Sequence, residues 1–184
     1  MTHQTRLFTR LAETHKAGCE FALDGPLPEA APCPETLAAT LGSQDMARYA
    51  ADCRPVYEDL RRIIGQISGL LILARLTAQR QVADLPEHAA CLARMAQAQT
   101  RFDAIAPVPG STAHRDQLEA ALGFSRLALR TLTQAREPGF EAALDLAGQQ
   151  VKRAYAHLRG ATAPKAGLEM VDLSQACCCG QGAH

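Results

Sequence analysis

Four long stretches of the chain place apolar residues three or four positions apart, and prolines and glycines interrupt the chain between them. The stretches cover about residues 44–83, 86–105, 113–136 and 140–160. This spacing is the period of an α-helix that buries one face. Pro86, Pro107, Pro109, Gly110, Pro138 and Gly139 mark the breaks. The pattern therefore predicts four long amphipathic helices.

The connections between these predicted helices are short, and short connections make neighbouring helices run antiparallel. We therefore expect an all-α fold, an antiparallel up-down four-helix bundle. The composition agrees, because aromatic residues make up only 4% of the chain and Trp is absent. Ala and Leu fill the apolar positions, and both have high helix propensity.

Each predicted helix has a set of residues expected to face the bundle interior. In chain order these are Val56, Leu60, Ile63, Ile64, Ile67, Leu70, Leu71 and Ala74, then Ala89, Leu92, Met95, Phe102 and Ile105, then Leu118, Leu122, Leu129 and Leu132, and finally Phe140, Leu144, Ala147, Val151, Ala154 and Leu158. Pro55 leaves two alternatives open, because it either kinks one long helix or begins a new one.

The uncharged residues 63–74 are too few to cross a bilayer, so we interpret them as a buried core helix. They contain Gly65 and Gly69, the spacing of a membrane-helix dimerisation motif. In a bundle outside a membrane, we expect these glycines to let another helix approach closely.

The ends of the chain differ from this pattern. An additional N-terminal helix is predicted at residues 3–17, followed by a Pro-rich loop at 24–34 and a short helix at 35–41 that ends before Gly42. We assign residues 1–162 to the helical bundle domain. Residues 163–184 are predicted to be a linker and a flexible Cys-rich tail, in which Leu168, Met170, Val171 and Leu173 could dock a short segment back on the bundle.

Charge and motifs narrow the classes of function. Lys and Arg together number 19, as do Asp and Glu, so the chain lacks the basic surplus typical of nucleic-acid binders. Signatures for nucleotide, flavin or covalent haem binding are absent, and no enzyme motif is found. The first twenty residues lack the apolar core of a secretory signal. We therefore expect a cytoplasmic protein that binds neither nucleic acid nor membrane, and rank an enzyme last.

The run Cys177-Cys178-Cys179, with His184 at the end of the sequence, is the feature that most favours a particular chemistry. Thiolates are soft ligands that bind Cu(I) and Zn(II). Cu(I) accepts two or three sulfurs, and Zn(II) takes four ligands, which three thiolates and one imidazole would supply. Gly180 would allow the sharp bend that such a site needs.

A weaker second metal site is suggested by His15 with Cys19 and by His88 with Cys91. Spacings of four and three residues place each pair on one helix face. Two such pairs on adjacent helices would form a Cys2His2 site. The alternative is that each pair is an ordinary part of the core, because cysteine is among the most buried residue types.

These observations favour a non-enzymatic protein that binds Cu(I) or Zn(II) through the tail and exchanges metal or thiols with a protein partner. The alternative function is a structural or protein-interaction bundle in which neighbouring cysteines act as a thiol redox latch, since strained, exposed disulfides are labile. The sequence leaves the oligomeric state open.

Overall fold

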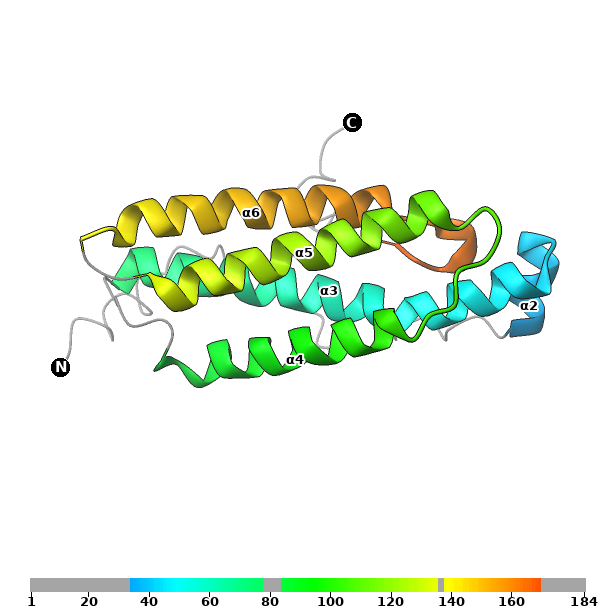
Figure 1. Cartoon of the computed structure of the whole chain (residues 1–184), viewed down its shortest axis with the longest axis horizontal. Helices are drawn as coiled ribbons and strands as arrows, with labels where there is room; N and C mark the ends of the chain where they lie inside the picture. The colour runs from blue at the N-terminus through cyan, green and yellow to red at the C-terminus, as the bar shows by residue number, and fades with distance from the viewer. Residues whose placement is uncertain (1–33, 78–83, 136–137, 170–184) are drawn as a thin grey trace, which may run out of the picture. The chain divides into compact units, whose positions relative to one another are not determined.

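The computed structural model describes residues 34–77, 84–135 and 138–169, and all of them belong to one compact unit. These residues form five α-helices and one short 3-10 helix (Figure 1). The elements are α2 (Pro34–Leu41), α3 (Gln44–Thr77), α4 (Pro86–Asp103), α5 (Thr112–Gln134), α6 (Phe140–Gly160) and η2 (Pro164–Ala166). The predicted all-α class is thus confirmed for this part of the chain.

The four long helices lie side by side (Figure 1). α3 packs against α4, α5 and α6, α4 also contacts α5, and α5 and α6 contact each other along their lengths. The short helix α2 packs on α3. The predicted helix at 3–17, the loop at 24–34, the expected extension of α3 to residue 83 and the tail at 177–184 lie outside the described residues.

α3 is one continuous helix that runs through Pro55, which settles the alternative left open by the sequence. Because proline has no amide proton, the backbone carbonyl one turn before Pro55 lacks its usual helix hydrogen bond. Pro55 faces solvent, so this carbonyl lies on the side of α3 that water can reach. The Ser43 hydroxyl caps the start of α3, because it accepts a hydrogen bond from the Met46 amide at 3.3 Å. Gly42, at φ +70°, ends α2 in the left-handed conformation.

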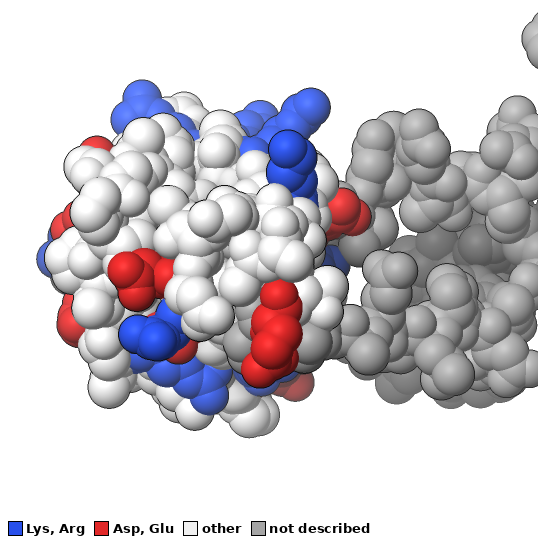
Figure 2. Space-filling model, turned by 90° about the vertical axis from the view of Figure 1, so that its right-hand side faces the viewer, with Lys and Arg blue, Asp and Glu red and all other residues white. Residues whose placement is uncertain are grey.

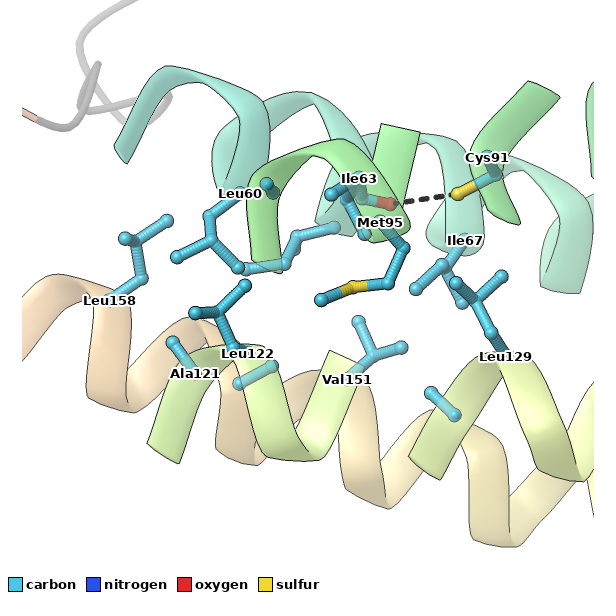
Figure 3. Packing of buried hydrophobic residues seen from close by; sticks show 14 of the residues in the cluster. Leu60, Ile63, Ile67, Cys91, Met95, Ala121, Leu122, Leu129, Val151 and Leu158 are labelled. Atoms are coloured by element: carbon cyan, nitrogen blue, oxygen red, sulfur yellow. Dashed lines mark hydrogen bonds between the residues drawn. The ribbon is translucent and has the colours of Figure 1, made fainter. Parts of the chain in front are cut away.

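The core is formed by the apolar faces of the four long helices. Every residue that the sequence placed inward on α3, α5 and α6 is buried. In Figure 3, Ile63 and Ile67 of α3, Met95 of α4 and Leu129 of α5 point into the same interior. The burial confirms these predictions. They succeeded because the apolar residues of α3, α5 and α6 keep the period of a helix over at least four turns.

The predicted inward face of α4 is wrong in part. Ala89 and Leu92 are exposed, and the buried face consists of His88, Cys91, Met95, Ala98 and Phe102. These residues have a regular helical spacing, but the first two of them are a histidine and a cysteine, which are less hydrophobic than leucine. Hydrophobicity alone therefore selected Leu92, which is 42% exposed, over its neighbour Cys91.

The expected role of Gly65 and Gly69 stays a prediction, because no described helix lies against them. Both glycines are exposed, and a Cβ built on either would meet no atom within 4 Å in the described structure. Farther along the same side of α3, Ile72 is 58% exposed and Leu76 is 72% exposed. Residues 63–74 are therefore buried on one face only, and the described helices leave the glycine face uncovered.

Residues 163–168, named here the C-terminal turn, fold back on the helices. Ala163 and Leu168 exchange two backbone hydrogen bonds at 2.8 and 3.1 Å, and Gly167 adopts φ +66° to close the turn. Ala166 and Leu168 are buried. The expected docking of Leu168 is confirmed, and the packed unit extends past residue 162. Within the described residues, no helix is both long and apolar enough to cross a membrane.

Candidate functional site

The predicted metal ligands fall mainly outside the described residues. Cys177, Cys178, Cys179 and His184 lie there, as do His15 and Cys19. His88 and Cys91 are described, and the structure places both on the buried face of α4, as their spacing predicts. Since the other half of the proposed Cys2His2 site is not described, that site stays a prediction.

Cys91 is sealed in the interior between α4 and α3. Its side chain is fully buried, and its thiol lies 4.0 Å from the Ile63 carbonyl oxygen, to which it donates a weak hydrogen bond (Figure 3). Burial raises the pKa of the Cys91 thiol to about 11. Because the thiolate is the form that binds metals and attacks electrophiles, Cys91 is a poor ligand and a poor nucleophile at neutral pH.

His88 is committed to a hydrogen bond between α4 and α5. Its Nε2 lies 3.1 Å from the Thr133 hydroxyl, and that hydroxyl donates its single proton to the Leu129 carbonyl at 2.8 Å. Thr133 must therefore accept from His88, which places a proton on Nε2. The described part of the chain holds no group of three or more His, Cys, Asp or Glu side chains arranged to bind a metal.

Cys53 and Tyr49 occupy successive turns of α3 on its buried face. Burial raises the pKa of the Cys53 thiol to about 11, and the charge of the nearby Asp52 adds to this effect. Burial also raises the pKa of the Tyr49 phenol. Cys53 is therefore a protonated core residue at neutral pH.

Tyr49 belongs to a hydrogen-bonded chain that the sequence did not reveal. His114 Nε2 lies 3.0 Å from the Ala161 carbonyl oxygen, which can only accept, so Nε2 carries a proton. Neutral His114 then accepts from the Tyr49 hydroxyl through Nδ1, at 3.0 Å. Burial lowers the pKa of His114, which favours this neutral form. The chain links α3, α5 and the end of α6.

A pocket of about 180 Å³ lies beside this chain. Its walls include Leu41 of α2, Met46 and Tyr49 of α3, His114 of α5, and Ala166 of the C-terminal turn. Figure 2 views the unit from the side on which α2 and this turn lie, and it shows acidic and basic side chains scattered over that face. The pocket lining itself is largely apolar.

The buried carboxylate of Asp59 joins α3 to α4. Its two oxygens face Arg101 at 2.5 Å and Arg94 at 3.7 Å. Because both oxygens are engaged by guanidinium groups, this aspartate is better explained as a structural tie than as a general base. The contact explains why a charged residue occupies a core position of α3.

Comparisons of the chain with protein-family models, with curated proteins and with solved structures gave no match. The function therefore has to be inferred from the side chains themselves. Inside the described helices, both thiols are buried, the imidazoles are hydrogen-bonded, and the carboxylate in the core is paired. These arrangements are typical of a scaffold more than of a catalytic centre.

Proposed function

We propose that this protein is a non-enzymatic binder of Cu(I) or Zn(II) whose metal ligands are Cys177, Cys178, Cys179 and His184. The helical unit serves as the scaffold. The observation that carries the proposal is the run of three consecutive cysteines with a histidine five residues beyond it. This set supplies soft thiolates and an imidazole, the donors that both ions prefer.

The chemistry of the helical unit supports this assignment by contrast. Cys53 and Cys91 are buried and their pKa values are raised to about 11. Deprotonating either thiol to bind a metal would place a charge in an apolar core. Metal capture by thiolates is therefore favoured at cysteines outside this core, of which the terminal triplet is the densest group in the sequence.

The scaffold is proposed to be an antiparallel up-down four-helix bundle. The order of colours along α3, α4, α5 and α6 reverses from each helix to the next (Figure 1), which supports this topology. Only a few residues separate α4 from α5 and α5 from α6. A cytoplasmic location fits the proposal, because thiols stay reduced there. A partner protein would deliver or receive the metal by exchanging ligands with the terminal thiols.

A second candidate function is protein interaction, with the cysteine run acting as a redox latch. The exposed face of α3 favours it, because no described residue covers the backbone at Gly65 and Gly69, and Ile72 and Leu76 extend the same face with apolar side chains. Such a face suits packing against a helix of another protein. The α3 face and the metal ligands lie in different parts of the chain, but the latch would use the same three cysteines as the metal site.

The metal proposal is tested by counting metal bound to protein purified without air. The full-length chain and a chain ending at Ala176 are loaded with Cu(I) or Zn(II) and equilibrated with a competing chelator. A full-length Cys91→Ala variant is the matched control, because it removes one thiol from the core and leaves the triplet intact. We expect the full-length chain and the control to retain equal amounts of metal.

Removal of residues 177–184 is expected to abolish retention against the chelator. Equal retention by the truncated chain would contradict the proposal and move the site to the remaining cysteines and histidines. If neither chain retains either ion, metal binding is wrong and the interaction function takes its place. A disulfide within the triplet, detected by mass spectrometry after mild oxidation, would then support the latch.

A further inference from the structure

Small lining residues and a turn fixed by hydrogen bonds keep the pocket beside Tyr49 and His114 from being filled. Four of its lining residues, Ala50, Gly110, Ala163 and Ala166, have a methyl group or no side chain. The C-terminal turn is held in position over α3 by its own backbone bridge and by Arg54, whose guanidinium donates to the Ala166 carbonyl at 3.0 Å. Small residues under a fixed turn leave space that larger side chains would fill.

The polar side chains of Tyr49, Ser111 and His114 in the pocket lining have hydrogen-bond partners within the protein. Tyr49 donates to His114, and His114 donates to the Ala161 carbonyl. The Ser111 hydroxyl donates to the Val108 carbonyl at 2.8 Å and accepts from the Val108 amide at 3.2 Å. Since the described residues of the lining include no Lys, Arg, Asp or Glu, they offer a charged ligand no partner of opposite sign.

The size and lining of the pocket limit what it can accept. An engineered apolar cavity of about 150 Å³ in another protein stays dry and binds benzene. The present pocket has a similar volume, at about 180 Å³, but it is partly open to solvent; its apolar walls include the flexible thioether of Met46. Methionine side chains adapt to ligands of different shape and make favourable contacts with aromatic rings.

We infer that this pocket binds a small, neutral, mainly apolar molecule of about the size of benzene or phenol. Leu41, Met46, Ala166 and Leu168 would contact its apolar surface. A hydroxyl on the ligand would meet a lone pair of the Tyr49 oxygen, which keeps acceptor capacity after donating to His114. This site is separate from the proposed metal ligands and does not depend on them.

The inference is tested on the full-length protein by methyl NMR, with benzene and phenol as probes and benzoate as the charged comparison. Benzene and phenol are expected to shift the methyl signals of Met46, Ala166 and Leu168 saturably, with half-saturation on the order of 1 mM. Nuclear Overhauser contacts from probe protons to these methyls should locate the ligand. Benzoate is expected to give no saturable shift.

A pair of variants distinguishes this pocket from other apolar surfaces. Ala163→Leu would fill the pocket, and Ala143→Leu adds the same group at another half-buried alanine that does not line it. Ala163→Leu should weaken phenol binding at least tenfold and Ala143→Leu should not. If Ala163→Leu fails to fold, the contacts in the unmodified protein decide. The inference is overturned by probe contacts to other methyls, by absent saturation, or by benzoate binding as well as phenol.

Discussion

The helical unit and the C-terminal end of the sequence contain the same two kinds of metal ligand in different settings. Within the helices, Cys53 and Cys91 are buried, and His88 and His114 have hydrogen-bond partners. Cys177, Cys178 and Cys179 instead stand in a row before glycines. Three consecutive residues of a helix point in directions about 100° apart, so a single apolar face could not bury all three. The number of cysteines therefore says less about metal capacity than their spacing does.

The largest expected difference between the two settings is in thiol reactivity. A pKa near 11 instead of 9.0 lowers the thiolate fraction of Cys53 and Cys91 about 100-fold at neutral pH, and burial slows access further. In the folded apo-protein, these two thiols should react with an alkylating reagent at least about 100-fold more slowly than in urea. Quenched labelling with mass spectrometry measures each rate. Labelling at equal rates in both conditions would contradict the burial of these cysteines.

Stability should respond to the core cysteine and not to its exposed neighbour. Cys91→Ser puts a hydroxyl where the sulfur lies 4.0 Å from the Ile63 carbonyl, a distance that the smaller oxygen cannot bridge. The unpaired hydroxyl should lower the free energy of unfolding by about 1–3 kcal/mol. The matched change Leu92→Ser, at an exposed position of α4, should lower it by less than about 0.5 kcal/mol. Urea unfolding measures both free energies. A larger loss for Leu92→Ser than for Cys91→Ser would show that Leu92, as predicted from the sequence, lies on the buried face of α4.

A smaller effect is expected from His114, a half-buried histidine of the helical unit. Burial lowers the pKa of His114 below its usual 6.5, so the folded state binds fewer protons than the unfolded state in mildly acidic solution. The stability that neutral His114 supports is therefore complete above pH about 6.5 and declines as the pH falls below that value, by no more than about 1.4 kcal/mol per pH unit.

The measurement compares unfolding free energies of the natural chain and of His114→Gln between pH 8 and pH 5. The natural chain should lose more stability over this interval, because glutamine does not titrate. Identical pH profiles would show that His114 takes up a proton equally well in both states. The buried imidazole would then resemble one in water, which the Tyr49 and Ala161 contacts argue against.

The helices were predictable because their signals are local. A short stretch of sequence is enough to show the helical period of α3, α5 and α6, and the same is true of the proline and glycine breaks. The face of α4 was missed because its buried positions carry His88 and Cys91, which hydrophobicity ranks below Leu92.

The candidate sites were predictable only where two residues share one helix. His88 and Cys91 lie on one buried face, as their spacing indicates. Their partners, Thr133 and the Ile63 carbonyl, come from other helices and left no signal in the sequence. Tyr49 lies on the same helical stripe as Cys53, yet it meets His114 from 65 positions away, and only the packed structure brings them together.

Metal binding by the cysteine run can be measured by mapping which cysteines Cu(I) protects from alkylation. The full-length protein, reduced and free of air, is alkylated with and without one equivalent of Cu(I), and each cysteine is quantified by peptide mass spectrometry. If the cysteine run binds Cu(I), the metal should strongly protect Cys177, Cys178 and Cys179 from alkylation. Cys53 and Cys91 should be alkylated slowly whether or not metal is present. Full labelling of the triplet in the presence of bound Cu(I), with protection appearing at other cysteines, would contradict the metal proposal.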